Sequence, residues 1–448
     1  MKLLGNTQSV CPICLKVLPA VKEADETGVY LKKNCPKHGE FRTLIWEGSA
    51  SSYTAWGREN LSAEQPVHPE KKGGDCPRQC GLCEEHQRKG CCMLLEVTGR
   101  CNLKCPVCFA SAGSGSRREP TLEELDQQYD FLMQHGGPFN IQLSGGEPTL
   151  REDLPELIRR GRKKGFTFFQ LNTNGMRLAC EEGYAQSLKD AGLNTVFLQF
   201  DGTTEEVYRT LRGRALLDYK KQAIANCSEA GLGITLVPVI APGVNDHQIG
   251  EILRFALSHM PYVRGVHFQP ISYFGRCDQK RPDMPITIPR MLRLMEEQTE
   301  GALQISDFSG GGAENPYCSF HASYRVRDGK LKAMKKRSEC CCCTTSDDSR
   351  TFVERQWSFD AASVIPGAGS SKQESAAALM QTDAFDEFLL ELHRETFAVS
   401  GMIFQDAWNL DLDRLKRCYI CEMDPEYGMV PFCAYNLTDQ KGTYLYRK

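Results

Sequence analysis

Three cysteines on one short segment are the strongest chemical signal in the chain. They form the sequence Cys101-Asn-Leu-Lys-Cys105-Pro-Val-Cys108. Thiolates are natural ligands of iron–sulfur clusters, and three of them leave one iron of a [4Fe–4S] cluster without a protein ligand. A catalytic metal needs such an open position, so the spacing predicts a catalytic cluster. A structural zinc loop that borrows a distant fourth ligand is the alternative.

A glycine-rich turn follows the cysteine segment after a predicted strand. It has the sequence Ser144-Gly145-Gly146-Glu147-Pro148. Glycines let backbone carbonyl groups approach a ligand closely, although Gly-Gly before Pro also marks an ordinary turn. Other polar residues lie on or just after later predicted strands, where they could line a site or serve as turn and cap residues. They are Asn172, Asn174, Asp201, Asn245 and Gln269.

The remaining cysteine groups predict further metal sites. A C-x2-C-x20-C-x2-H set is typical of structural zinc, with rubredoxin-like iron as the second choice, and comprises Cys11, Cys14, Cys35 and His38. A C-x3-C-x2-C-x7-C set would complete an electron-transfer or structural cluster, with Cys92 competing as fourth ligand and zinc as the alternative; its members are Cys76, Cys80, Cys83 and Cys91. A third cluster is expected from Cys318, Cys418, Cys421 and Cys433.

Four consecutive cysteines, 340–343, cannot all bind one metal, because adjacent side chains of an extended chain point to opposite sides. One of them could replace Cys318 or Cys421 in the third cluster.

Composition limits the class of partner and compartment. The chain has 448 residues, 22 cysteines and a net charge of −3, which gives no general attraction to nucleic acid or anionic lipid. We find no secretory signal and no apolar run of membrane-spanning length, so we expect a cytoplasmic protein whose cysteines bind metal.

Short apolar runs alternate with amphipathic stretches between residues 93 and 290. This alternation predicts an α/β fold with a parallel sheet, either an open barrel or a doubly wound sheet. The apolar runs cover 93–97, 140–143, 166–171, 195–200, 234–240 and 265–271. The helical patterns cover 122–134, 154–164, 181–191, 217–230 and 247–258. We therefore divide the chain into a metal-binding domain (1–58), an auxiliary iron–sulfur segment (59–92), the central α/β domain (93–290) and a C-terminal domain in which we expect an auxiliary cluster (291–448).

The cysteine and glycine motifs together carry a family resemblance. Residues 97–109 resemble the signature of the radical S-adenosylmethionine (SAM) superfamily, in which an aromatic residue, here Phe109, follows the third cysteine. The resemblance implies a partial (β/α)6 barrel in which the methionine part of SAM chelates the open iron. It also implies that the glycine turn binds the methionine amino group. Cleavage of SAM would then give a 5′-deoxyadenosyl radical that removes a hydrogen atom from a substrate.

The order CPIC…CPKHG, DCPRQCGLC, EVTGRCNLKCPVCFA and PFCAYN is similar to a multi-cluster group of that superfamily. The group includes archaeal tetraether lipid synthases and pterin methyltransferases. The resemblance implies attack on an unactivated C–H bond, with C–C bond formation on lipid alkyl chains as one outcome. Alternatives are a pterin methyltransferase, a peptide-modifying enzyme and a non-catalytic electron carrier. Residues 317–323 depart from the group's pattern, which leaves the substrate and the third-cluster ligands open.

The implied cofactors are two or three [4Fe–4S] clusters, SAM and one mononuclear zinc or iron. A small-molecule or lipid substrate and a reductant such as ferredoxin or flavodoxin are the expected partners. Peripheral contact with a membrane is compatible with a lipid substrate. The lack of basic excess argues against RNA as a partner.

A long apolar substrate would need a tunnel, because burying each methylene is worth about 0.8 kcal/mol. Its candidate walls are Phe385, Phe388, Leu389, Leu392, Phe397, Met402 and Phe404. The first four share one face of a predicted helix. The alternative is that this face packs in an ordinary core.

Overall fold

The computed structural model describes residues 1–57, 67, 75–113, 118–278, 281–311, 314–334, 345–359 and 384–447. The cysteine run 340–343 lies outside the described residues, as does the side chain of Phe385. The division into four domains stays a prediction.

The N-terminal region is a four-stranded antiparallel sheet. Its strands follow in order as β1 (Lys2–Val10), β2 (Val17–Ala24), β3 (Gly28–Cys35) and β4 (Gly39–Glu47), and helix α1 (Ala50–Trp56) comes next. The turn after β1 carries Cys11 and Cys14, and the turn between β3 and β4 carries His38. Consecutive hairpins therefore bring two turns from different parts of the sequence to one end of the sheet.

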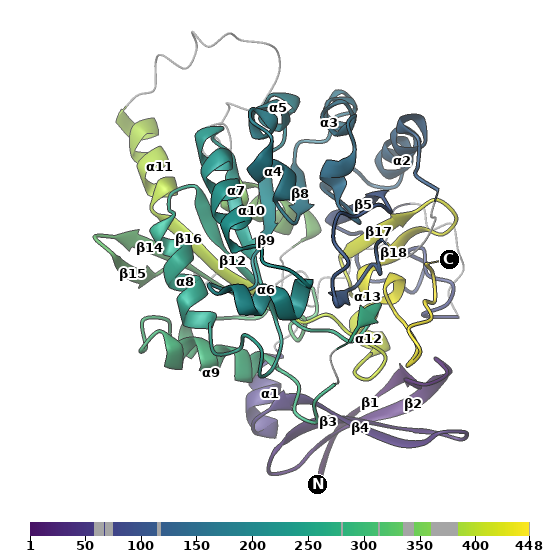
Figure 1. Cartoon of the computed structure of the whole chain (residues 1–448). Coiled ribbons are helices and arrows are strands. Elements are labelled where there is room, and N and C mark those ends of the chain that lie inside the picture. Colours follow the sequence, from purple (N-terminus) through teal and green to yellow (C-terminus); the bar gives the residue numbers. More distant parts are fainter. Residues whose placement is uncertain are drawn as a thin grey trace.

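The centre of the molecule is a parallel sheet with helices on its outer face (Figure 1). All six predicted strands are present, as β5 (Cys92–Thr98), β7 (Asn140–Gly145), β8 (Phe169–Thr173), β9 (Thr195–Gln199), β10 (Gly233–Val237) and β12 (Val263–Pro270). Each pairs in parallel with the next. Every residue of β10 is buried, as expected for a strand with both faces covered. The predicted α/β fold is confirmed.

The connections between these strands are helical. The helices are α2 (Leu122–Gln134), α3 (Leu154–Lys163), α4 (Met176–Cys180), α5 (Tyr184–Ala191), α6 (Glu205–Arg212), α7 (Leu217–Glu229) and α8 (Ile249–Ser258). The predicted amphipathic stretches correspond to α2, α3, α5, α7 and α8, whereas α4 and α6 were not predicted. Thr121 and Glu124 form a reciprocal capping box that starts α2. Short elements at the site are β6 (Val107–Cys108), the 3-10 turn η1 (Pro148–Leu150), β11 (Val239–Ile240) and β13 (Arg276–Cys277).

The C-terminal region adds strands to both edges of the same sheet. These strands are β14 (Ser319–Arg327), β15 (Lys330–Ala333), β16 (Thr396–Met402), β17 (Ile420–Asp424) and β18 (Gly428–Pro431). Strand β16 pairs in parallel with β12, and β17 pairs in parallel with β5. The helices of this region are α9 (Ile288–Gln298), α10 (Ser346–Trp357), α11 (Ala384–Arg394), α12 (Leu412–Leu415) and α13 (Phe432–Tyr435). The region that looks irregular in sequence therefore completes the central sheet.

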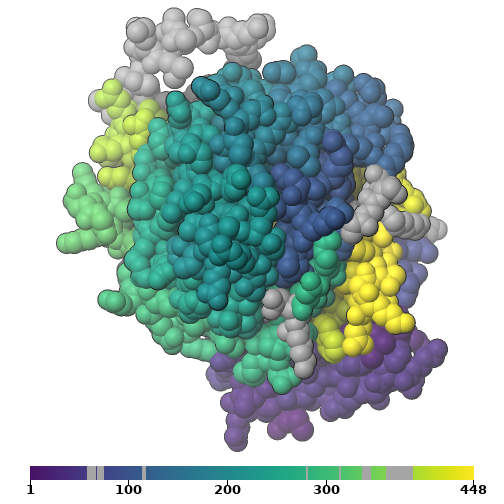
Figure 2. Space-filling view, in the orientation of Figure 1, coloured from purple at the N-terminus to yellow at the C-terminus, as the bar shows by residue number. Residues whose placement is uncertain are grey.

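The N-terminal sheet docks on the C-terminal segment that follows β16. In Figure 2 it forms the purple lobe beneath the yellow C-terminal residues. The buried Lys33 ammonium group donates to the carbonyl oxygens of Ala407 and Trp408 at 2.8 and 2.9 Å. Asp411 accepts from Thr7 at 2.6 Å and forms an ion pair with Lys22 at 2.6 Å. Within the described residues, no helix has the length and apolarity needed to span a bilayer.

Candidate functional site

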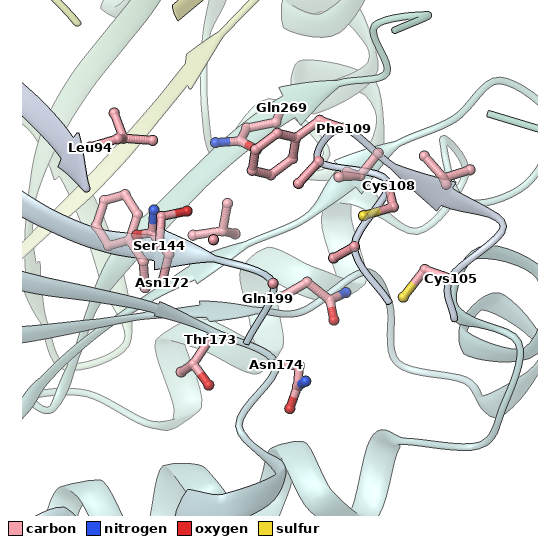
Figure 3. Close-up of a pocket in the computed structure, with 18 of the residues that line it drawn as sticks. Leu94, Cys105, Cys108, Phe109, Ser144, Asn172, Thr173, Asn174, Gln199 and Gln269 are labelled. Carbon is pink, nitrogen blue, oxygen red and sulfur yellow. The ribbon is translucent and has the colours of Figure 1, made fainter. Parts of the chain in front are cut away.

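A cavity of about 260 Å³ opens at the carboxyl ends of the parallel strands (Figure 3). The three predicted cluster ligands line it, together with seven other predicted site residues. Those seven are Phe109, Gly145, Gly146, Glu147, Asn172, Asn174 and Gln269. The structure thus brings together motifs that are far apart in sequence, at the end of the sheet where parallel α/β folds bind ligands.

The cysteine loop is held from outside by the segment containing β13. Residue Arg276 pairs with Cys108 in a short antiparallel ladder, and its guanidinium group donates to the Cys105 carbonyl oxygen at 2.7 Å. Burial raises the pKa of the Cys101 thiol to about 12 and also raises that of Cys105. These thiols ionise readily only beside a cation, and three soft donors facing one cavity fit an iron–sulfur cluster.

The two glycines let the turn after β7 close directly onto the cysteine loop. A Cβ atom on Gly145 would lie 2.3 Å from the Thr98 carbonyl oxygen, and one on Gly146 would lie 2.0 Å from that of Arg100. Gly145 also has a φ of +126°, which disfavours other residues. The Gly146 amide donates to the Thr98 carbonyl at 2.7 Å. Close contact between two backbone segments therefore requires both glycines, whatever the turn binds.

Glu147 connects the ends of two neighbouring strands. One of its oxygens accepts from the Thr173 hydroxyl at 2.6 Å, and the other accepts from the Asn174 amide at 2.7 Å. The Asn174 side chain in turn donates to Asn102, inside the cysteine loop, at 2.7 Å. Glu147 and Asn174 thereby fix the glycine turn relative to the cluster ligands.

Three of the residues predicted to bind the cofactor lie outside the cavity lining. Asp201 and Asn245 are fully buried, and Pro148 is buried in η1. The Asn245 amide group donates to the carbonyl oxygens of Asp201 and Val239, each at 2.7 Å. Asp201 and Asn245 therefore hold strand ends in place, and direct contact with SAM stays a prediction that this geometry does not support.

Several cavity residues were missed by the sequence analysis. Gln142 and Gln199 come from β7 and β9, His267 comes from β12, and Arg212 ends α6. Gln142 accepts from the Asn172 amide at 3.3 Å, and His267 contacts the Ser400 hydroxyl at 2.9 Å. Burial lowers the pKa of His267 to about 4, so its imidazole is neutral at pH 7. Side chains alternate between the two faces of a strand, and this alternation is the signal by which Gln142, Gln199 and His267 could have been predicted to face the cavity.

An aromatic group from the C-terminal region supplies much of the apolar lining. The ring centroids of Phe404 and Phe432 are 4.4 Å apart, and Phe432 lies 5.7 Å from Phe109. Ile420 and Leu94 extend this apolar lining. The C-terminal strands thus contribute directly to the cavity.

The expected tunnel wall along α11 is wrong. Helix α11 precedes the first residue of β16, whereas Phe404 follows its last residue, so the two lie at opposite ends of that strand. Phe388 is 51% exposed, and among the six candidates whose side chains the structure describes, only Phe404 lines the cavity. Local helical periodicity could not reveal which end of the sheet the helix covers.

The C-terminal segment also supports the cysteine loop. The Tyr444 hydroxyl donates to the Phe109 carbonyl at 2.6 Å. The buried Arg447 guanidinium group is paired with Glu96 of β5 and donates to Asn436 at 2.7 Å. Glu96 lies five residues before the first cluster cysteine, so these contacts stabilise the base of the loop.

The N-terminal sheet carries a preformed four-ligand site. The ligand atoms of Cys11, Cys14, Cys35 and His38 all lie within 4.8 Å of one another. The His38 Nδ1 atom is 3.4 Å from the Cys11 sulfur and 3.5 Å from the Cys35 sulfur. Two thiols on one turn and a thiol with an imidazole on the next match a closed tetrahedral metal site.

The structure places the fourth ligand predicted for the 76–83 set beside the C-terminal cysteines. The Cys91 amide donates to the Tyr419 carbonyl at 2.9 Å. Burial raises the pKa of the Cys91 thiol, and the nearby groups Cys92, Glu314, Cys421 and Cys418 raise it further. Cys421 is also among the thiols that raise the pKa of Cys80. The two predicted clusters would therefore be neighbours, and the division of ligands between them stays a prediction.

The third predicted set is gathered near the segment between β16 and β17. Cys433 accepts from the Gln405 amide at 3.2 Å, and Cys318 accepts from the Arg414 guanidinium group at 3.4 Å. Burial raises the pKa of the Cys433 thiol, and the thiols of Cys418 and Cys318 raise it further. Residues separated by more than 90 positions in sequence thus lie close together.

Two protein-family models match this sequence, one over the central sheet and one over the N-terminal sheet. Residues 95–256 match the sequence model of the radical SAM superfamily, and residues 3–47 match that of an N-terminal zinc ribbon domain found in the HMPTM family. A loop with three cysteines beside a glycine turn, at the carboxyl end of a parallel sheet, defines the radical SAM class of iron–sulfur enzyme. The chain belongs to the radical SAM superfamily.

Individual relatives cover different shares of the chain. A 7,8-dihydro-6-hydroxymethylpterin dimethyltransferase from Methanocaldococcus jannaschii is 35% identical over 96% of this chain and 93% of that protein. A probable GTP 3′,8-cyclase from Methanothermobacter thermautotrophicus is 32% identical over 38% of this chain and 55% of its own length. The crystal structure of Streptococcus suis SuiB bound to S-adenosylmethionine matches with a TM-score of 0.41 and 18% identity, over 47% of each chain.

Proposed function

We propose that this enzyme abstracts a hydrogen atom from an unactivated C–H bond of a compact, pterin-like substrate, as one step of its methylation by a separate one-carbon donor. The long relative described above is named for methylation of a pterin, which supports this reaction class. When bound at the cysteine loop, a reduced [4Fe–4S] cluster and SAM supply a 5′-deoxyadenosyl radical. The abstraction breaks one C–H bond of the substrate and forms one in 5′-deoxyadenosine.

The chain's own residues position the reactants. Cys101, Cys105 and Cys108 would hold the cluster, and the turn 145–147 would hold the amino-acid part of SAM. The cavity lies on the inner side of this loop and is walled by the parallel strands. We propose Asn172, Asn174 and Gln269 as additional polar contacts for the bound cofactor or substrate.

The observation that carries the proposal is the set of amide side chains in the cavity. Gln142, Asn172, Gln199 and Gln269 come from four strands and line one cavity. Each primary amide offers both donors and an acceptor, which suits the alternating donors and acceptors along the edge of a planar heterocycle. Part of this capacity is already used within the protein, because Asn172 donates to Gln142 and accepts from Gln170. Gln199 likewise donates to Asp201 and accepts from Lys220. A saturated hydrocarbon would offer no partner to the amide donors and acceptors that remain, at a cost of about 1–3 kcal/mol for each one left buried.

The test uses substrates with deuterium at candidate C–H positions. The reconstituted enzyme receives dithionite and SAM with either a reduced pterin or a saturated alkyl lipid in vesicles, and deuterium in 5′-deoxyadenosine is measured by mass spectrometry. We expect transfer from the pterin and about tenfold less transfer in Gln142→Leu. Gln222→Leu, on the exposed face of α7, is the matched control. Transfer from the lipid alone would refute the proposal.

C–C bond formation between lipid alkyl chains is the second candidate. The aromatic and aliphatic lining from Phe404, Ile420 and Phe432 favours it, because transfer of an alkyl chain from water to apolar surroundings is favourable. The same deuterium experiment tests it. Transfer from the lipid, followed by a product with twice the lipid mass less two hydrogens, would support it.

We propose further metal groups around this centre. Zinc is the expected ion at the N-terminal site because three thiols and one imidazole, close to one another, are a ligand set typical of closed structural zinc sites. One or two auxiliary clusters would use the thiols of the 76–91 segment and of the C-terminal set. Ferredoxin or flavodoxin would supply the low-potential electron. Metal analysis and Mössbauer spectroscopy of the reconstituted protein test the number and type of these groups.

A further inference from the structure

A buried ion pair lies beside the cysteine loop. The Arg212 guanidinium group donates to both oxygens of Asp201, at 2.7 and 2.8 Å. The Asp201 side chain is 0% exposed and that of Arg212 is 9% exposed. Two strong charge-assisted hydrogen bonds in a fork geometry fix the guanidinium plane, so its orientation is set by the protein rather than by solvent.

A further donor of this arginine reaches the cysteine loop itself. The Arg212 Nη1 atom donates to the carbonyl oxygen of Val107, between two cluster cysteines, at 3.1 Å. Arg212 lines the cavity together with Cys105 and Cys108. The next residue, Gly213, lies close to Lys104 and Pro106 of the same loop. Helix α6 therefore delivers a fixed positive charge to the ligands of the catalytic cluster.

We propose that Arg212 is a positioning residue that makes the catalytic cluster easier to reduce, and that Asp201 limits this effect. Reduction adds one negative charge to the cluster, and a nearby positive charge stabilises the more negative state. The partner carboxylate acts in the opposite sense. Charge and hydrogen bonds next to the ligands are established means by which proteins tune cluster potentials.

The proposal predicts shifts of opposite sign for the two partners. Arg212→Gln removes the positive charge, so the midpoint potential should become more negative. Asp201→Asn leaves the positive charge uncompensated, so the potential should become more positive. Arg212→Lys keeps the charge without the fork and should lie closer to the wild-type value than Arg212→Gln does.

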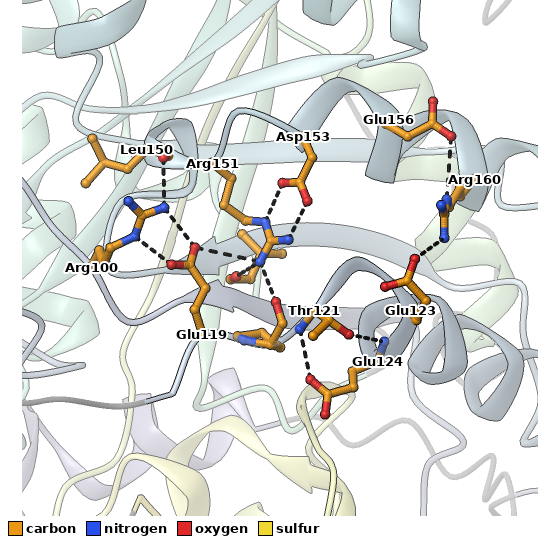
Figure 4. Close-up of polar contacts among 12 residues, drawn as sticks. Arg100, Glu119, Thr121, Glu123, Glu124, Leu150, Arg151, Asp153, Glu156 and Arg160 are labelled. Carbon is orange, nitrogen blue, oxygen red and sulfur yellow. Dashed lines mark hydrogen bonds and ion pairs between the residues drawn. The ribbon is translucent and has the colours of Figure 1, made fainter.

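The chain contains a matched control for the loss of a buried arginine. Arg151 also donates to both oxygens of an aspartate, Asp153, at 2.8 and 2.7 Å, and to a backbone carbonyl, that of Val97, at 2.9 Å (Figure 4). Arg151 is buried but is absent from the lining of the cavity. Arg151→Gln should therefore show any loss of stability that follows from removing a buried arginine–aspartate pair. It should leave the midpoint potential of the catalytic cluster unchanged.

The experiment is a dithionite titration of the reconstituted full-length protein, with the reduced cluster measured by electron paramagnetic resonance. Auxiliary clusters are resolved from the catalytic one by the spectral change that SAM causes at the open iron. For Arg212→Gln we expect the ratio of reduced to oxidised catalytic cluster at a fixed potential to fall about tenfold, equivalent to about 59 mV for one electron.

Two outcomes would overturn the proposal. One is an unchanged potential in Arg212→Gln with full cluster content. The other is an Asp201→Asn shift that is absent or has the same sign as that of Arg212→Gln. If Arg212→Gln assembles no cluster, the sign of the Asp201→Asn shift decides alone.

Discussion

His393, at the end of α11, makes hydrogen bonds that require its neutral form. Arg264 donates to the His393 Nδ1 atom at 3.3 Å and to its carbonyl oxygen at 2.9 Å. Nδ1 is therefore an acceptor, and the Nε2 proton is donated to the Ser358 carbonyl at 2.9 Å. Burial, and then the Arg264 charge, lower the pKa of His393 from 6.5 to about 4.

Acid should therefore loosen the docking of α11. The unfolded histidine takes up a proton near pH 6.5 and the folded one near pH 4, so the unfolded state binds more protons in this interval. Stability is then unaffected above pH 6.5 and falls as the pH falls toward 4. The difference between the two pKa values corresponds to about 3.4 kcal/mol, which the partial exposure of the imidazole reduces to about 2 kcal/mol.

Hydrogen exchange across residues 387–402 measures this effect in the metal-loaded protein. After correction for intrinsic exchange rates, we expect the opening free energy at pH 5 to be about 1 kcal/mol lower than at pH 7.5, or about fivefold less protection. His393→Gln should abolish this difference, and Arg264→Met should reduce it. An equal loss of protection in His393→Gln would refute the reasoning.

Three further predictions concern the metal centre. Cys105→Ala should abolish formation of 5′-deoxyadenosine from SAM and dithionite, whereas Cys180→Ala, at an exposed thiol, should not; product in the first variant would contradict the catalytic role of the loop. Alanine in place of the three cysteines of segment 76–83 should remove about four irons per chain and keep SAM binding, and unchanged iron and sulfide would rule this cluster out. Gly146→Ala should weaken SAM binding about tenfold, as measured by calorimetry, because the added Cβ would lie 2.0 Å from the Arg100 carbonyl oxygen. Wild-type affinity in this variant would show that the glycine turn can move independently of the cysteine loop.

The central sheet could be predicted from the sequence because each strand carries its own apolar run. The six parallel strands β5, β7, β8, β9, β10 and β12 each contain a short apolar run and are separated by helices, and this alternation is enough to predict parallel pairing. Strands β16 and β17 could not be placed in the same way. Their neighbours, β12 and β5, are separated from them by more than 100 residues, and local periodicity contains no information about such pairing.

The site was predictable where a motif is contiguous and unpredictable where it is assembled by folding. The cysteine loop and the glycine turn are short segments, and the residue types within each are enough to indicate its chemistry. Arg212 lies outside every helix and strand predicted from the sequence, and only the fold brings it to Val107. Asp201 stood out as a polar residue at a strand end, but its partner is that arginine rather than the cavity.

The pairing of β17 with β5 has a consequence for the order in which the enzyme is made. On the ribosome, the cysteine loop emerges long before residues 420–424, which form the outer neighbour of its strand. Arg447, which pairs with Glu96 at the base of that loop, follows Glu96 by 351 positions. The loop therefore stays open on one side throughout translation. Closure of this side of the cysteine loop therefore depends on residues that are among the last of this sequence to be synthesised.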